Sequence, residues 1–320
     1  MKLIVQIPCF NEEKTLPQTV RDIPRQVEGI DSVEILVIDD GSTDRTVEVA
    51  KEIGVDHIVR NKGNKGLAFS FMVGLDACLR LGADIIVNTD GDNQYKGADI
   101  PKLIAPVLEG KADIVVGDRK TDGIAHFSLT KRFLQKLGSR VVNMLSGLKI
   151  PDAVSGFRAF SREAAMRINI VSSYSYTVEA IIQAGKKKLT VVSIPIGTNP
   201  KTRESRLIKS IPRFIGMQLN TMVRMYTMFK PLRVFFFTGF FFFVCGLIPS
   251  LRFLFYYMHG VGSGHVQSLI LAAVLFFIGT QIIVLGLLGD VISSNRKLIE
   301  ETLLRVKRIE LDYLEKNRKE

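Results

Sequence analysis

Two long uncharged apolar runs near the C-terminal end constrain the fold of this chain most strongly. The first extends from Val234 to Leu251 and contains seven phenylalanines, and the second extends from Val266 to Gly289. A helix needs roughly 20 apolar residues to cross the hydrocarbon core of a bilayer. Core helices of soluble proteins rarely stay uncharged for so long. We therefore expect two transmembrane helices, at about 234–257 and 266–289, and keep a pair of buried core helices as the alternative.

The charges around the two runs predict how the hairpin is oriented. The connection 259–265 contains no Lys or Arg, whereas the segment 201–233 carries eight cations and one acid. Because cytoplasmic loops are enriched in Lys and Arg, we expect an integral protein of the cytoplasmic (inner) membrane whose N-terminal domain and C-terminus lie in the cytoplasm. The formal net charge of +11 then indicates attraction to an anionic leaflet and not to nucleic acid.

The first 200 residues alternate between strand-like and helix-like segments. Strands are predicted at 3–7, 34–38, 57–59, 85–89, 114–117 and 189–195, and helices at 13–20, 44–53, 67–81, 100–108 and 130–145. This alternation favours an α/β fold in which helices cover both faces of a mostly parallel sheet. In such folds, ligands bind beyond the carboxyl ends of the strands.

An acidic segment follows the fourth predicted strand. The strand runs directly into Asp90 and Asp92, which are followed by Gln94. If the strand register persists, both carboxylates point to the same side, where they repel each other unless a cation lies between them. Mg²⁺ typically takes one or two carboxylates together with substrate phosphates. For this segment taken alone, a solvated Asp-Gly turn is the alternative.

Three further polar segments stand at predicted strand ends. The first strand is followed by residues 8–13 (PCFNEE), the second by 39–46 (DDGSTDRT) and the third by 61–68 (NKGNKGLA). Each is common turn chemistry by itself. Their order and spacing, together with the segment 90–94, are highly specific.

In these segments the chain resembles the family-2 glycosyltransferases, which have the GT-A fold. Within that family it is similar to the polyprenyl-phosphate glycosyltransferases related to dolichyl-phosphate mannose synthase and bacterial undecaprenyl-phosphate glucosyltransferases. The resemblance covers roughly residues 3–210 and includes the run 152–160 (DAVSGFRAF), a mark of this subfamily. It implies a GT-A, Rossmann-like, mostly parallel sheet with flanking helices, followed by interfacial helices and the two-helix transmembrane hairpin.

The resemblance also implies roles for individual residues. The nucleotide sugar would be held from the first four segments, by Pro8, Phe10, Asn11, Glu12, Asp39, Asp40, Lys65 and Asp90. A Mg²⁺ or Mn²⁺ ion would be held by Asp90, Asp92 and Gln94. Arg119 matches the arginine of the family's Gly-Ser-Arg motif and would lie near the phosphates. The catalytic candidates are Asp92, Arg119, Arg203 and Arg206.

Two segments depart from the family's pattern. The family's Asp-Ala-Asp-Leu-Gln reads Asp-Gly-Asp-Asn-Gln here, which keeps the side chains expected on the metal. The family's Arg-x-x-Gly-x-Ser-Lys reads KTRESRL at 201–207, so its cations are kept but shifted. Which of Lys201, Arg203 and Arg206 would contact the acceptor phosphate stays open, and binding of lipid headgroups is the alternative. The acceptor-phosphate candidates are Lys201, Ser205, Arg132, Ser139 and Ser155.

The chemistry of the acceptor decides what else the site needs. A sugar hydroxyl must lose a proton to a general base, whereas a lipid monophosphate already carries an anionic oxygen. The hydroxyl-specific, processive relatives typically carry Gln-x-x-Arg-Trp, and this chain contains no Trp. We therefore predict inverting, metal-dependent transfer of a hexose from a nucleotide sugar (UDP-glucose or GDP-mannose type) to polyprenyl phosphate. Transfer to a glycan or glycolipid hydroxyl and a non-enzymatic sugar-nucleotide sensor are the alternatives.

These features divide the chain into four parts. We expect a catalytic domain at 1–205, interfacial amphipathic helices at 206–232, the transmembrane hairpin at 233–290 and a cytoplasmic helix at 291–320. In the last part Ile299, Leu303, Val306 and Tyr313 are close to heptad spacing, which indicates an interfacial helix or a seam for homo-oligomers. The sugar and the nucleotide base stay open.

Overall fold

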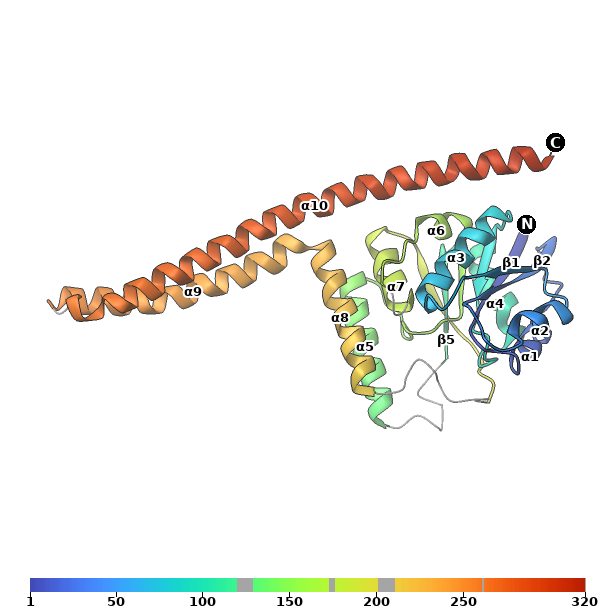
Figure 1. The fold of residues 1–320 in the computed structure, drawn as a ribbon, viewed down its shortest axis with the longest axis horizontal. Helices are drawn as coiled ribbons and strands as arrows, with labels where there is room; N and C mark the ends of the chain where they lie inside the picture. The colour runs from blue at the N-terminus through green and yellow to red at the C-terminus, as the bar shows by residue number, and fades with distance from the viewer. Residues whose placement is uncertain (120–128, 173–175, 201–210, 261, 320) are drawn as a thin grey trace. The chain divides into compact units, whose positions relative to one another are not determined.

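The computed structural model describes residues 1–119, 129–172, 176–200, 211–260 and 262–319 (Figure 1). By its contacts the chain divides into two units. The first comprises Met1–Met222 and Leu304–Glu320, and the second comprises Val223–Leu303.

The first unit is built on a seven-stranded sheet with the order β3-β2-β1-β4-β6-β5-β7. The strands are β1 (Lys2–Cys9), β2 (Ser32–Asp39), β3 (His57–Arg60), β4 (Ile85–Asn88), β5 (Ile114–Asp118), β6 (Arg158–Ser161) and β7 (Val191–Pro195). β1 pairs in parallel with β2 and β4, β2 with β3, and β5 with β7, whereas β6 is antiparallel to both β4 and β5. The predicted mostly parallel α/β sheet is confirmed.

Helices connect the strands of this sheet. They are α1 (Leu16–Arg21), α2 (Thr46–Glu52), α3 (Leu67–Arg80), α4 (Ile100–Leu108), α5 (Leu129–Ser146), α6 (Arg162–Arg167) and α7 (Tyr176–Lys186), with α8 (Ile211–Phe229) leading into the second unit. The sequence predicted α1 to α5 within a few residues of their observed positions. It did not predict β6, which begins within the motif 152–160, or α6 and α7, which follow it.

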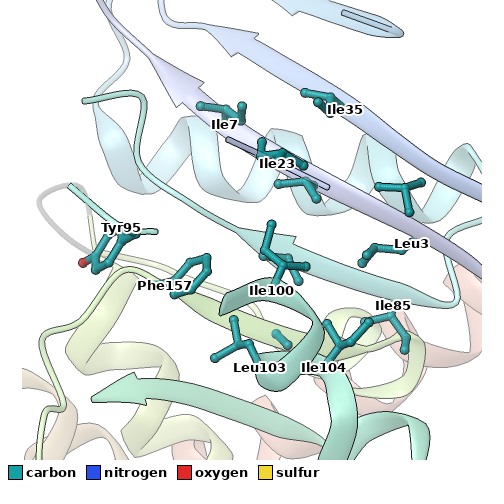
Figure 2. Packing of buried hydrophobic residues seen from close by; sticks show 14 of the residues in the cluster. Leu3, Ile7, Ile23, Ile35, Ile85, Tyr95, Ile100, Leu103, Ile104 and Phe157 are labelled. Carbon is teal, nitrogen blue, oxygen red and sulfur yellow. The ribbon is translucent and has the colours of Figure 1, made fainter. Parts of the chain in front are cut away.

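Side chains from alternate positions of the strands separate the core into two layers. On one face, Leu3, Ile7 and Ile35 pack with Ile100 and Leu103 of α4 (Figure 2). The other face carries the intervening positions of the same strands and contacts α3. Because both faces are covered, the central strands β1, β2, β4 and β5 are mostly buried apolar runs, which is why the sequence revealed them.

The second unit is an antiparallel hairpin of α9 (Pro231–Met258) and α10 (Val266–Lys319) (Figure 1). Both helices are long and apolar enough to cross a membrane. A Cβ added to Gly239 would lie 2.6 Å from the carbonyl oxygen of Gly279, and one added to Gly279 would lie 2.8 Å from that of Gly239. Glycine at both positions therefore lets the two backbones touch, as small residues do between membrane helices.

The last turns of α10 belong to the first unit. Leu304 and Leu311 are buried there, one heptad apart. Arg308 forms an ion pair with Glu163, Glu310 with Arg80 and Glu315 with Arg162. Val306 and Tyr313, which the sequence placed on the self-association seam, are 54% and 65% exposed. The tail therefore packs a neighbouring face against the rest of the first unit.

Candidate active site

The parallel strands of the first unit end at one side of the sheet, which we call the carboxyl edge. The segments that follow β1, β2, β4, β5 and β7 meet there, joined by the segment 152–156, which precedes the antiparallel β6. Four of the five sequence motifs lie in these segments and the fifth follows β3. The sheet therefore brings the predicted site residues to one edge, as expected for this class of fold.

Asn11 joins the segment after β1 to the segment after β2. Its backbone has a φ of 56°, a left-handed conformation that Asn tolerates better than most residues. Its side-chain oxygen accepts hydrogen bonds from the backbone N–H of Thr43 at 2.8 Å and of Asp44 at 3.4 Å, and its own N–H donates to Ser42 Oγ. Asn11 thus shapes the predicted nucleotide loop, which Pro8 and Phe10 flank as half-buried neighbours.

The two adjacent aspartates after β2 have different environments. Both carboxylate oxygens of Asp40 accept hydrogen bonds, from the backbone N–H groups of Lys65 and Gly66 and from the side-chain amide of Asn61. Asp40 therefore holds the loop that precedes α3, and the Lys65 side chain is exposed. Asp39 is fully buried, and one of its oxygens, Oδ2, accepts no hydrogen bond, although Arg60 Nε lies 3.1 Å away.

Glu12 is the remaining candidate in the loop after β1. It is buried, and its carboxylate accepts a hydrogen bond from the Thr15 hydroxyl at 2.7 Å. Its backbone N–H donates to Thr46 Oγ1 at 2.8 Å. These bonds tie the loop to the start of both α1 and α2.

The strand register does not continue through the acidic segment after β4. The strand ends at Asn88, the chain turns at Gly91 and Asp92, and Asn93 has a φ of 56°. Asp92 Oδ1 accepts the backbone N–H of Gln94 at 3.2 Å, which closes the turn. The expectation that an extended strand would align the two carboxylates is therefore wrong, and a turn presents Asp90, Asp92 and Gln94 instead, all half-buried.

A buried hydrogen-bond network holds Gly156, the residue against which the Asp90 side chain lies. Asn88 donates from its amide to the carbonyl of Gly156 at 3.0 Å and to the hydroxyl of Tyr176 at 2.8 Å. The backbone N–H of Gly156 donates to the hydroxyl of Tyr95 at 2.9 Å. The Tyr95 ring stacks on Phe157 with centroids 5.2 Å apart, as Figure 2 shows. Burial raises the pKa of Tyr95 to about 12, so its hydroxyl stays protonated.

Gly156 leaves room for Asp90. A Cβ added at Gly156 would lie 3.1 Å from both carboxylate oxygens of Asp90 and from the Tyr176 hydroxyl. These distances are tighter than ordinary carbon–oxygen contacts. The glycine of the motif 152–160 therefore sets how closely the Asp90 carboxylate approaches the sheet.

Arg119 lies in a bidentate ion pair with Asp152. Its Nε and Nη2 donate to the two carboxylate oxygens at 2.7 and 3.0 Å. Burial disfavours the charged guanidinium, but neighbouring Tyr95 and the Asp152 carboxylate outweigh this effect and raise the pKa of Arg119. The arginine is thus a permanent cation of fixed orientation beside the acidic loop.

The segment 152–156 is held by a buried arginine. Arg158 is fully buried and donates to the carbonyls of Ser155 and Ala153, each at 2.9 Å. Ser155 and Ser139, both predicted to contact the acceptor phosphate, are buried as well. Ser139 Oγ accepts the Ala153 N–H at 3.4 Å, whereas Ser155 Oγ has no hydrogen-bond partner. Their assignment to the acceptor phosphate therefore stays a prediction.

The segment after β7 is attached to the acidic loop. Asn199 donates from its backbone to the carbonyl of Gln94 at 2.9 Å and from its side chain to the carbonyl of Asn93 at 3.1 Å. The predicted residues Lys201, Arg203, Ser205 and Arg206 follow directly and lie outside the described residues, as does the side chain of Arg132.

The acidic loop offers oxygen ligands of the kind that Mg²⁺ and Mn²⁺ prefer. Among the residues that the structure describes, no three His, Cys, Asp or Glu side chains cluster as a complete metal site. Two carboxylates and the Gln94 amide oxygen form an incomplete set, which fits an ion that takes its remaining ligands from substrate phosphates and water. The donor set therefore fits a metal that arrives with a nucleotide.

The sequence of residues 4–168, half of the chain, matches the profile of glycosyl transferase family 2. The chain belongs to this family. Residues 230–294 match the GtrB C-terminal hairpin, which identifies the second unit.

Two family members illustrate the likeness. The UDP-N-acetylglucosamine–dolichyl-phosphate N-acetylglucosaminyltransferase of Methanococcus voltae is 32% identical over 214 residues, which is 60% of this chain and 83% of that protein. Glycosyltransferase AglJ of Haloferax volcanii is 28% identical over 308 residues and covers 95% of this chain and 96% of its own length.

Solved structures show the same fold. Glucosyl-3-phosphoglycerate synthase from Mycobacterium tuberculosis, in complex with Mn²⁺, UDP-glucose and phosphoglyceric acid, superposes with a TM-score of 0.56 at 20% identity. The match covers 71% of this chain and 78% of that one. The GT-A fold implied by the sequence motifs is thereby confirmed.

Sequence reasoning missed the residues that support the site. Asp152, Tyr95, Tyr176 and Asn88 were not selected, although Asp152 opens a motif that was singled out. The partner of Asp152 is Arg119, 33 positions earlier in the chain, so the motif 152–160 alone gives no signal for this ion pair. The two tyrosines and the asparagine carry no signal either, because only the fold brings them together.

Proposed function

We propose that this family-2 glycosyltransferase transfers a hexose from a nucleoside-diphosphate sugar to polyprenyl phosphate, with inversion at the sugar. The observation that carries the proposal is the turn Asp90–Gln94 at the carboxyl edge, seated on Gly156 beside the fixed Arg119–Asp152 pair. Carboxylates and a permanent cation lie together there, as transfer from a diphosphate requires.

The loops after β1 and β2 would bind the nucleotide. Asp39 Oδ2 lies in an ion pair with Arg60 but accepts no hydrogen bond, so it is suited to accept one from an N–H group of the base. Asn11 and Asp40 would act indirectly, by holding the loops between which the base lies. Phe10 offers an apolar surface to the nucleoside.

Asp90, Asp92 and Gln94 would hold a divalent metal. When bound, such an ion neutralises the diphosphate as negative charge develops on the leaving group. Gly156 and Asn88 position the Asp90 carboxylate. The ion pair with Asp152 keeps Arg119 charged and holds its guanidinium in one orientation. Such preorganisation lowers the cost of rearranging charges during the reaction.

The acceptor would attack with a phosphate oxygen. A bond forms between that oxygen and C1 of the sugar on the face opposite the leaving group, and the bond from C1 to the diphosphate breaks. The nucleoside diphosphate leaves with the electron pair. Because the attacking oxygen is already anionic, orientation and charge neutralisation suffice without a general base. Cations of the segment 201–207, which follows Asn199 in the sequence, are the candidates for orienting it.

The second unit would anchor the enzyme in the membrane that contains the lipid acceptor. Its two apolar helices match the GtrB C-terminal hairpin, and relatives are named for dolichyl-phosphate, polyprenol and undecaprenyl-phosphate substrates. We propose that the hairpin spans the cytoplasmic membrane with the catalytic unit on the cytoplasmic side, where the flanking cations are retained.

The Asp92→Ala variant tests the metal-bound donor site. We expect transfer to polyprenyl phosphate to fall by at least about 10²-fold, since the diphosphate loses its stabilisation. The matched control is Asp76→Ala, which removes a half-exposed carboxylate paired with Arg80 on α3. Thermal unfolding in the same detergent reports whether each variant folds. Full transfer by a folded Asp92→Ala variant would contradict the proposal.

A further inference from the structure

Arg296 on α10 is only partly neutralised within the second unit. Its Nη1 lies 3.4 Å from Glu300 Oε1, and the guanidinium carbon lies 4.1 Å from the centre of the Phe229 ring. Its Nε and Nη2 are buried and have no hydrogen-bond partner. Two orphaned donors of a buried cation are costly, because each has lost its water without gaining an acceptor.

The two orphaned donors form one edge of the guanidinium. Nε–H and Nη2–H point in parallel, and this fork matches two oxygens of one phosphate or carboxylate. Phe229 covers the flat face of the group, so it fixes the direction in which the fork points. The geometry therefore suits a bidentate oxyanion better than a single water molecule.

The position of Arg296 along the hairpin indicates the kind of oxyanion. The second apolar run ends at Gly289, and seven further residues of helix add about 10 Å. Helical side chains lean towards the N-terminal end of their helix, so the guanidinium reaches back towards the apolar run. The headgroup layer on each side of a bilayer is roughly 5–8 Å thick, so the fork would lie at the depth of lipid phosphates.

Contacts of α10 with the end of α8 and the start of α9 define the same level. Ser293 donates to the carbonyl of Met228 at 3.1 Å, and a Cβ added to Gly289 would lie 2.9 Å from Pro231 Cβ. These contacts place Phe229 and Arg296 together at the polar end of the hairpin, where α9 begins.

We propose that the Nε/Nη2 edge of Arg296 binds the phosphate group of a membrane lipid. The lipid is either a phospholipid of the bilayer or the polyprenyl phosphate acceptor, since both carry phosphate at this depth. The proposal rests on the membrane placement in the proposed function, and its readout is lipid binding, which needs no sugar transfer. A failure here therefore leaves the proposed transferase activity standing.

The test measures lipid retention by native mass spectrometry on the full chain in a neutral detergent. The probes are phosphatidylglycerol, undecaprenyl phosphate and, as the phosphate-free control, diacylglycerol. We expect retention of phosphorylated lipid by the wild type, and about tenfold weaker retention by Arg296→Lys, which keeps the charge but loses the fork. Arg233→Lys, an exposed arginine near the same end, is the matched control and should change nothing.

The lipid whose retention falls identifies the source of the phosphate. A change with phosphatidylglycerol assigns the site to bilayer phospholipid, and a change with undecaprenyl phosphate assigns it to the acceptor. Equal retention by the wild type and Arg296→Lys, or no preference of the wild type over diacylglycerol, would overturn the proposal.

Glu300→Gln is expected to strengthen lipid retention, whereas a folding defect would weaken it. Removing the carboxylate beside Nη1 raises the positive potential at the free edge, so lipid retention should become stronger. Unchanged or weaker retention by this variant would also overturn the proposal.

Discussion

At the scale of single residues, the site depends on side chains that do not face the substrate. Asp90 rests on Gly156, whose carbonyl and N–H are held by Asn88 and Tyr95. Arg119 is oriented by Asp152. Such a supporting layer fixes the geometry that electrostatic catalysis requires, because charged groups then need no rearrangement during the reaction.

Gly156→Ala tests this support. The added methyl group would meet both Asp90 oxygens at 3.1 Å, and overpacking of this kind costs about 1–3 kcal/mol. We expect Asp90 to be displaced, so that the apparent affinity for Mn²⁺, measured from the metal dependence of transfer, falls about tenfold.

Gly138→Ala on α5 is the control for this change. A Cβ there has nothing within 4 Å, and Ala stabilises a helix interior by about 0.5–1 kcal/mol relative to Gly. Metal affinity should therefore not change in Gly138→Ala. An unaltered metal dependence in Gly156→Ala would show that Asp90 does not need this close approach.

The site residues that could be predicted from the sequence are those that lie close together in the chain and share one kind of chemistry. Asp90, Asp92 and Gln94 stood out as adjacent oxygen ligands after a strand. Tyr176 and Asn88 did not, because they are separated by 88 positions in the chain and meet only in the folded sheet. Ser155 was assigned to the acceptor phosphate from its motif, and that assignment stays a prediction, because the residue is buried and its hydroxyl has no hydrogen-bond partner.

At the scale of elements, continuous apolar strands were predictable and a short antiparallel one was not. β6 has four residues and begins with Arg158, so its composition gives no strand signal. It forms because the buried guanidinium finds two carbonyl oxygens in the preceding turn. The tail was predicted as a helix, but the face that it buries depends on the partner it meets, and that partner is the catalytic unit.

The attachment of the tail to the catalytic unit should depend on pH. Burial by itself would raise the pKa of Glu163, but hydrogen bonds from Arg308 and Arg167 outweigh it, and the pKa is lowered from its ordinary value of 4.5. A carboxylate with a lowered pKa stabilises the folded form above its ordinary pKa, and this contribution is lost as the pH falls through the lowered value.

We therefore expect the tail to be protected at pH 7 and to lose protection as the pH falls below the ordinary value of 4.5. Hydrogen exchange over residues 304–319, corrected for intrinsic rates, measures this, and Arg308→Gln should reproduce part of the loss at neutral pH. The effect is modest, about 0.2–1 kcal/mol, because the pair is partly exposed to solvent. Protection that is independent of pH would mean that Leu304 and Leu311 alone hold the tail.

At the scale of the whole molecule, one chain combines the proposed sugar-nucleotide site with an apolar hairpin. The first unit carries the acidic turn and the fixed arginine of a family-2 glycosyltransferase. The second is a glycine-packed hairpin that exposes phenylalanine and leucine side chains. An enzyme that joins a water-soluble donor to a lipid acceptor needs both kinds of surface, which is the central claim of the proposed function.

The mass of the lipid product tests this claim most directly. The purified chain is incubated with Mg²⁺ or Mn²⁺, a panel of UDP- and GDP-sugars, and either undecaprenyl phosphate or the matching unphosphorylated polyprenol. We predict one nucleotide sugar that yields undecaprenyl phosphate carrying a single added hexose, with release of the nucleoside diphosphate and no product from the polyprenol. Sugar transfer to a hydroxyl acceptor alone, with undecaprenyl phosphate left unmodified by every donor, would contradict the account.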